Sequence, residues 1–210
     1  MTKRVLWGVG SSRALRAHWA LVFLDLDYET RPILTRTPAM ETPEYRAVNP
    51  RGKIPTLIDG DLTLTESPAI VAYLAERYST PERRLIPEAL DQRALYFEWM
   101  SFISMELDAT SLYVLRRHEG LPEIYSPAPE ACVAARAYFE RMITAATVRL
   151  EDGRRYLLGD DFFGVDILMT TVLDWAVNYG FDLPDAFAAY RTRIDEDPST
   201  ALAHRANTSL

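Results

Sequence analysis

The chain contains 210 residues, 48% of them hydrophobic, and its formal net charge is −7. This length is enough for one large domain or two small ones with a substantial apolar core. The negative charge argues against nucleic acid and against an anionic membrane surface as partners. The one cysteine, Cys132, cannot form an internal disulfide, and no cysteine and histidine cluster has metal-site spacing, so we expect no bound metal.

The sequence shows neither a membrane segment nor an export signal. No uncharged apolar run approaches the length that crosses a bilayer. Basic residues are scattered through the first 19 residues, which therefore lack the apolar centre of a signal peptide. We therefore expect a cytoplasmic protein that does not bind membranes.

The N-terminal part of the chain is predicted to alternate between strands and a helix. Residues 4–7 read as a short buried strand, residues 8–12 as a loop, and residues 14–24 as a helix with an apolar side. Residues 28–34 are predicted to form a second strand. Residues 35–47 are polar and contain two prolines, so we expect mostly loop there, with at most one helical turn.

A turn and a hairpin follow. Asn49-Pro50 marks the turn. Ile54-Pro55 then places a proline directly before a strand, where the amide can be cis. Residues 56–65 carry leucines in two short extended runs around an Asp-Gly-Asp turn, which predicts a hairpin.

A helix closes the first predicted domain. Ser67 and Pro68 open this helix, with serine as the N-cap and proline at the first helical position. The full order is strand, helix, strand, hairpin and helix. This order predicts a thioredoxin-like α/β domain with a mixed sheet over residues 1–78.

The remainder of the chain reads as helix behind a short linker. Residues 79–89 contain two prolines and a charged run, which predicts the linker. Residues 90–210 are predicted to form an all-α domain. Residues 90–117 are expected to form one long helix, or two with a bend between them. Further helices are expected at 131–150, 166–179, 185–194 and 200–206.

Four residues, Ile54, Pro55, Glu66 and Ser67, have the chemistry of a site for a peptide-like ligand. A residue before a cis-proline can offer its backbone N–H and C=O sideways to an extended peptide. The N-terminus of a helix suits a carboxylate, and Glu66 just outside it could take a cationic amine. A ligand with a carboxylate and an amine on one carbon, followed by a peptide-like backbone, fits all three features.

These residues stand in the sequences NPRGKIPTL and ESPAI, and the stretch resembles the glutathione-binding half of glutathione S-transferases. The resemblance implies that Ile54 pairs with the cysteinyl backbone of glutathione, and that Glu66 and Ser67 hold its γ-glutamyl group. Lys53 could reach the glycine carboxylate, or it could simply be solvated. The resemblance covers residues 1–78, and the alternative is a plain hairpin with a well-capped helix.

The second predicted domain carries its own resemblance. Residues 99–107, WMSFISMEL, resemble the start of the helical domain in bacterial, beta-class transferases, although Asp108 stands where that class has His. Residues 159–167, GDDFFGVDI, resemble the start of the family's buried helix. Asp166 matches the acid of a capping box, but Phe163 replaces the usual Ser or Thr N-cap. We therefore expect Asp166 to play a structural role by satisfying backbone N–H groups.

The loop GVGSSR, residues 8–13, lies where this family carries a Tyr, Ser or Cys that contacts the sulfur of glutathione. Alignment of LRAHWAL with the family's first helix implies that Ser11 occupies the serine position, with Ser12 beside it as the alternative. No Tyr ends the first strand and no Cys lies in the loop, which disfavours the tyrosine and cysteine types. Without the resemblance, the two serines would be read as helix-capping residues.

A serine hydroxyl is sufficient in magnitude to activate the thiol. A free thiol titrates near a pKa of about 8.5, and lowering that pKa by two units requires about 2.7 kcal/mol. One hydrogen bond to a charged group contributes roughly 1.5–3 kcal/mol. The N-terminus of the first helix adds about 0.3–1 kcal/mol. The serine would therefore donate to the thiolate and would not itself be the nucleophile.

The resemblance implies a glutathione S-transferase that activates the thiol of glutathione for attack on a small apolar electrophile, and that forms a homodimer. A second-substrate pocket could be lined by apolar residues that, on spacing alone, are more often core residues: Trp7, Val9, Phe102, Met105 and Tyr113.

Two other functions stay open at this point. One is a glutathione-binding or regulatory relative that has lost turnover. The other is a glutathione-dependent isomerase, dehalogenase or peroxidase. Zeta-type isomerases carry a Ser-Ser-Cys loop, and Arg13 occupies the third position here, which weakens the isomerase alternative.

Overall fold

The computed structural model describes residues 3–208, which fall into two compact units. The first unit runs to Ile86 and resumes at Ile194, and the second spans Pro87–Arg193. The last helix therefore belongs to the first unit, although its residues follow the helical segment along the chain. The division predicted from the sequence, 1–78 and 90–210 with a linker at 79–89, differs from these units in the placement of that helix and of residues 79–86, which belong to the first unit.

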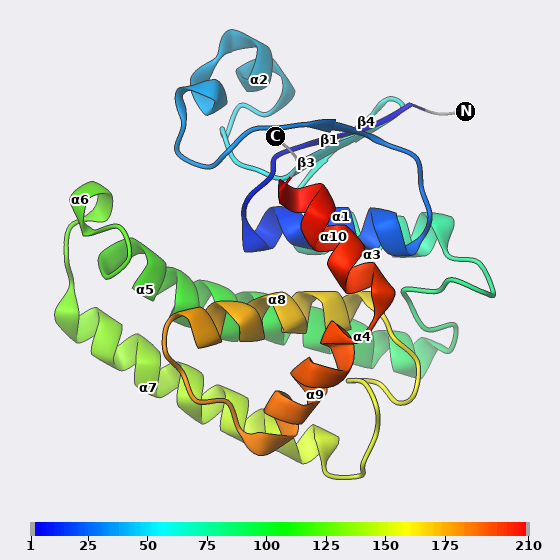
Figure 1. Ribbon diagram of the computed structural model, residues 1–210, viewed down its shortest axis with the longest axis vertical. Helices are drawn as coiled ribbons and strands as arrows, with labels where there is room; N and C mark the ends of the chain where they lie inside the picture. Colours follow the sequence, from blue (N-terminus) through cyan, green and yellow to red (C-terminus); the bar gives the residue numbers. More distant parts are fainter. Residues whose placement is uncertain (1–2, 209–210) are drawn as a thin grey trace. The chain divides into compact units, whose positions relative to one another are not determined.

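The first unit is built on a four-stranded mixed sheet (Figure 1). The strand order is β2-β1-β3-β4, with β1 parallel to β2 and antiparallel to β3, and β3 antiparallel to β4. A two-residue turn with Gly60 at a φ of 61° closes the predicted hairpin. The strands are β1 (Arg4–Trp7), β2 (Glu29–Arg31), β3 (Thr56–Asp59) and β4 (Leu62–Thr65).

Helices cover both faces of this sheet. Figure 1 shows α1 (Ser12–Phe23), α3 (Ser67–Tyr78) and α10 (Pro198–Thr208) on one side and α2 (Pro43–Val48) on the other. Helix α1 contacts both α3 and α10. Burying a large apolar side chain contributes about 1.5–3 kcal/mol, so the sheet and these helices stabilise one another. Their largest fully buried apolar side chains are Leu6, Trp19, Leu21, Leu57, Ile70 and Leu74.

Two segments near β2 differ from the sequence-based expectation. The second strand covers only Glu29–Arg31 instead of residues 28–34. Pro32 follows directly and has no N–H to continue the ladder. The segment expected to be mostly loop contains a 3₁₀-helix, η1 (Pro38–Glu41), and then α2. Both helices start with a proline, and the Thr42 hydroxyl caps α2 by accepting from Tyr45 N at 3.3 Å.

The second unit is helical, as predicted. The predicted long helix at its start changes type along its length, because a ten-residue π-helix separates two α-helices. The elements are α4 (Leu90–Phe102), η2 (Ile103–Leu112, the π-helix), α5 (Tyr113–His118), α6 (Pro122–Tyr125), α7 (Pro129–Ala146), η3 (Thr147–Leu150), α8 (Gly164–Asn178) and α9 (Asp185–Asp195).

Asp166, at the start of α8, has the structural role that was predicted from its position. Its side chain is fully buried and accepts hydrogen bonds from Leu157 N at 3.0 Å, from Phe163 N at 2.8 Å and from the Tyr190 hydroxyl at 2.7 Å. Burial raises the pKa of the Asp166 carboxyl to about 6, and these three donors act against that rise. The carboxylate therefore joins the start of α8 to the preceding loop and to α9.

Between residues 3 and 208, no helix combines the length and apolar character that crossing a bilayer requires.

Candidate functional site

The sheet register brings three predicted site segments to one edge of the first unit. Trp7 at the end of β1 pairs with Thr56 at the start of β3, and Thr56 pairs with Thr65 at the end of β4. The loop after β1, the segment before β3 and the segment after β4 therefore lie side by side. These segments carry Ser11 and Ser12, Lys53 to Pro55, and Glu66 with Ser67.

The Ile54-Pro55 peptide bond is cis, as the sequence allowed. Lys53, the residue before Ile54, is held through its backbone. Its carbonyl oxygen accepts from the Tyr45 hydroxyl at 2.5 Å and from Asn49 Nδ2 at 2.7 Å. Both donors are buried. The Lys53 side chain is exposed. Ile54 is buried in an apolar cluster with Tyr45.

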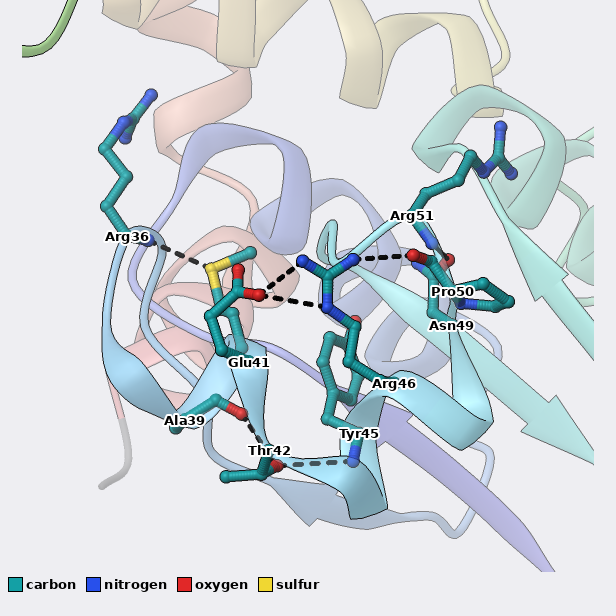
Figure 2. A network of polar contacts seen from close by, with 10 residues as sticks. Arg36, Ala39, Glu41, Thr42, Tyr45, Arg46, Asn49, Pro50 and Arg51 are labelled. Carbon is teal, nitrogen blue, oxygen red and sulfur yellow. Dashed lines mark hydrogen bonds and ion pairs between the residues drawn. The ribbon is translucent and has the colours of Figure 1, made fainter.

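A polar network on α2 supports the turn that leads into this segment (Figure 2). Arg46 donates to Pro50 O at 2.6 Å, and its guanidinium also contacts the Glu41 carboxylate. Asn49 Oδ1 accepts from Arg51 N at 3.1 Å, which closes the turn locally. Helix α2, which lies in a segment expected to be mostly loop, thus positions the residues before β3.

Glu66 and Ser67 lie at the start of α3, but their roles in the cap differ from the prediction. Ser67 was predicted to be the N-cap, with Pro68 at the first helical position. Instead Glu66 is the N-cap, because its carbonyl accepts the first helical bond from Ile70 N at 2.9 Å. Glu66 has a φ of 69°, an uncommon backbone conformation for a residue with a side chain. Ser67 is therefore the first helical residue and is buried.

Charged groups surround this helix start. Arg16 on α1 is almost fully buried, and its Nη1 lies 3.4 Å from Ser67 Oγ. The exposed Glu66 carboxylate pairs with Arg51, with 3.3 Å between Oε1 and Nη1. A positive group thus lies beside the Ser67 hydroxyl, while a negative group faces solvent one residue earlier.

Ser11 is the N-cap of α1, and Ser12 is its first helical residue. Ser11 Oγ accepts from Ala14 N at 3.1 Å, and Ser11 O accepts from Leu15 N at 2.9 Å. An N-cap hydroxyl uses a lone pair for this bond, so its O–H stays able to donate. Both serines are half-buried at the positive end of the helix.

The Ser11 loop contacts the cis-proline segment directly. Gly8 has a φ of 111°, and a Cβ placed on it would lie 2.5 Å from Ile54 Cβ. Only glycine fits this close approach. The loop is therefore packed against the residue predicted to bind the ligand backbone.

Two residues that hold the Ser11 loop, His18 and Asn207, belong to no sequence motif. His18 on α1 is fully buried. Its Nε2 lies 3.1 Å from Gly8 O, which can only accept, so Nε2 carries the proton and Nδ1 accepts from the Tyr28 hydroxyl at 2.8 Å. Burial lowers the pKa of His18 below its ordinary value. The second residue is Asn207, near the far end of the chain, whose side chain contacts Gly10 and Ser11.

The second unit contains several other residues singled out from the sequence. Asp108 is buried within the π-helix, and Met105 is 62% exposed. Cys132 is buried on α7, as expected of a small apolar residue, and burial raises the pKa of its thiol. A cavity of about 190 Å³ lies within this unit and includes Phe102. The other residues that line it are Glu98, Trp99, Met142, Ala145, Ala146 and Arg149.

Comparison with known proteins agrees with this geometry. Residues 1–76 match the family model described as glutathione S-transferase, N-terminal domain. Glutathione S-transferase GstA from Escherichia coli O157:H7 is 33% identical over 159 residues, which cover 74% of this chain and 74% of that protein. The chain belongs to the glutathione S-transferase family. Glutathione S-transferase Z1 from Arabidopsis thaliana is 29% identical over 174 residues, covering 80% of this chain and 74% of that protein.

Solved structures of this family superpose on the whole chain. The glutathione S-transferase from Xylella fastidiosa has a TM-score of 0.84 and 25% identity, covering 99% of this chain and 100% of that one. The theta class glutathione S-transferase from the citrus canker pathogen Xanthomonas axonopodis pv. citri, solved with glutathione bound, has a TM-score of 0.80 and 27% identity. That match covers 100% of this chain and 99% of that one.

These findings confirm the predicted fold class, a thioredoxin-like α/β domain followed by helices, and the predicted family. By family membership the chain is a glutathione S-transferase. The finer resemblance of the helical part to beta-class transferases stays a prediction.

Proposed function

We propose that this glutathione S-transferase binds glutathione at the edge of the sheet where β1 ends, β3 begins and β4 ends. The observation that carries the proposal is the convergence of three segments with matching chemistries at this edge. They offer a hydroxyl at a helix start, a backbone held before β3, and an acid followed by a second helix start. The Xanthomonas relative solved with glutathione bound supports the choice of ligand.

The γ-glutamyl end of glutathione would bind at the start of α3. Its carboxylate would accept from the Ser67 hydroxyl and from free N–H groups of the helix, with the Arg16 guanidinium adding positive charge nearby. Its ammonium group would contact Glu66. That contact would replace the exposed ion pair between Glu66 and Arg51. Loss of this ion pair costs little, because exposed ion pairs contribute only about 0–1 kcal/mol.

The rest of the tripeptide would follow the backbone before β3. Ile54 would pair through its N–H and C=O with the cysteinyl residue, as an added strand does. Pro55 directly follows Ile54 at the site edge. The exposed Lys53 ammonium would face the glycine carboxylate.

Ser11 would activate the thiol. The thiol would lose its proton to solvent water, and the Ser11 Oγ–H would donate to the resulting thiolate at the positive end of α1. The sulfur would then form a bond to the electrophilic carbon, and the leaving group would depart with the bonding electron pair. Ser12, one position further along α1, is the alternative donor. The second substrate would be a small apolar electrophile, and we expect a cytoplasmic homodimer.

A turnover panel tests this proposal. Wild-type protein and Ser11→Ala would be assayed with glutathione and one aryl halide, one alkyl halide and one hydroperoxide, with product analysis for each. We expect conjugation with the aryl halide and a fall in kcat/KM of about 10- to 100-fold in Ser11→Ala, since a hydrogen bond to a charged group is lost. Binding of glutathione without turnover of any electrophile would instead favour the non-catalytic alternative.

A further inference from the structure

Asn207 on α10 holds the backbone of the loop that carries Ser11. Gly10 N donates to Asn207 O at 2.8 Å and to Asn207 Oδ1 at 3.1 Å. Asn207 Nδ2 in turn donates to Ser11 O at 3.4 Å. One carboxamide therefore contacts both the N–H of Gly10 and the carbonyl of Ser11.

These contacts add to the support of a loop in which three other backbone groups have hydrogen-bond partners. Gly8 N donates to Arg31 O and Val9 N donates to Ile33 O, each at 3.0 Å. His18 donates to Gly8 O. Gly10 has a φ of 71°, a conformation that residues with a Cβ adopt less easily, so glycine favours the turn toward α1 at this position. The contacts to Gly10 N come from Asn207, almost two hundred residues away in sequence. At Ser11 O the Asn207 side chain adds a second donor to the helical bond from Leu15 N.

Asn207 is itself held in place. Its side chain is 7% exposed, and α10 packs along α1 within the first unit. At the other end of α10, Trp19 Nε1 on α1 donates to Ser199 Oγ at 2.9 Å. The two helices are therefore joined at both ends, with Asn207 at the end nearest to the loop.

We propose that Asn207 is a positioning residue for thiol activation, which orients the Ser11 hydroxyl by fixing the peptide group that precedes Gly10 and the peptide group that follows Ser11. The inference rests on the proposed function of Ser11. Asn207 acts through the backbone of the loop and does not touch the substrate. A displacement of about 1 Å in a catalytic group can cost about 100-fold in rate, so a clamp at this position has a measurable effect.

The test combines a thiol titration with kinetics on Asn207→Leu and Asn207→Ala. Both substitutions remove the carboxamide but keep the main-chain bond from Gly10 N, and leucine also keeps the buried volume. The thiolate absorbance of bound glutathione would be followed against pH. We expect its pKa to rise by about one unit and kcat/KM to fall about tenfold, because the hydrogen bond from Ser11 is weakened. The Kd for glutathione, measured about one pH unit below the pKa of the bound thiol, should change less than about threefold, since the thiol is then protonated and the contacts at α3 are unaltered.

Ser199→Ala is the matched control. It removes a polar contact between α1 and α10 at the end away from the loop. We expect it to lower the unfolding midpoint without changing the pKa of the bound thiol. If Ser199→Ala raised that pKa as much as Asn207→Leu does, the effect would be one of helix packing and the positioning role would be refuted.

The remaining outcomes separate this inference from the proposed function. If the wild type binds glutathione and lowers the pKa of its thiol, but both Asn207 variants keep that pKa and kcat, the positioning role is wrong and the proposed function stands. If the wild type neither binds glutathione nor lowers the pKa of its thiol, the proposed function fails and the inference fails with it.

Discussion

Replacing Ser11 by alanine separates the two roles that this hydroxyl can have. In the structure Ser11 Oγ accepts from Ala14 N at 3.1 Å and caps α1. In the proposed mechanism the same oxygen also donates its proton to the thiolate. Ser11→Ala removes both interactions, whereas Ser11→Asp keeps an acceptor for the cap and places a negative charge beside the sulfur.

The two roles predict effects on two different quantities. Loss of a serine N-cap lowers the free energy of unfolding by about 0.5–2 kcal/mol. Loss of a hydrogen bond to a charged group, roughly 1.5–3 kcal/mol, raises the pKa of the bound thiol by about one to two units. Ser11→Ala should therefore change both quantities. Ser11→Asp should keep most of the stability and raise the pKa of the thiol at least as much.

Two assays measure these quantities separately. Urea denaturation gives the free energy of unfolding, and thiolate absorbance against pH gives the pKa of glutathione in the complex. Ser12→Ala is the matched control, because it removes the same group one residue further along and leaves the cap intact. A pKa that moves in Ser12→Ala and not in Ser11→Ala would refute the assignment of Ser11. A pKa unchanged in both would show that neither hydroxyl contacts the sulfur.

Two further predictions concern buried titratable groups. Asp166→Ala leaves three buried donors without an acceptor, so we expect the free energy of unfolding at pH 7 to fall by about 3 kcal/mol or more, measured by urea denaturation; a loss below 1 kcal/mol would contradict this role. Burial lowers the pKa of His18, so the unfolded chain binds that proton more readily and stability should fall as pH decreases below about 6.5. The raised pKa of Asp166 has the opposite effect on stability below about pH 6, and it is present in both the wild type and His18→Gln. The test is therefore the difference in the free energy of unfolding between these two proteins, measured from pH 7.5 to 5. This difference should narrow as the pH falls. A constant difference would show that His18 does not titrate differently in the folded state.

Local sequence signals were sufficient for the hairpin and for the start of α3, two of the elements at the proposed ligand site. Alternating leucines around an Asp-Gly-Asp turn predicted the β3–β4 hairpin, and Ile54-Pro55 allowed the cis peptide that the structure contains. Serine and proline predicted the start of α3 to within one residue, since caps depend on side chains close in sequence. The N-cap is Glu66 and not the predicted Ser67. This difference depends on the uncommon φ of Glu66, which its residue type does not predict.

Contacts between distant segments were beyond the same reasoning. Asn207 and His18 hold the loop of Ser11, yet neither belongs to a motif, because their roles arise from the packing of α10 and α1 and from the turn at Gly8. The π-helical turn within the long helix likewise follows a pattern that reads as ordinary α-helix. The early end of β2 is different in kind, because Pro32 stood in the sequence as a signal.

The central claim is that the edge formed by these three segments binds glutathione. Calorimetric titration of reduced glutathione near neutral pH, into the wild type and into Ser67→Ala, tests it most directly. Thr63→Ala is a matched control, because it removes an exposed hydroxyl from β4 away from this edge. We expect micromolar to millimolar binding by the wild type and by Thr63→Ala, and binding weaker by about tenfold or more in Ser67→Ala, because a hydrogen bond to the carboxylate is lost. No detectable binding by the wild type, or equal binding by all three proteins, would contradict the claim.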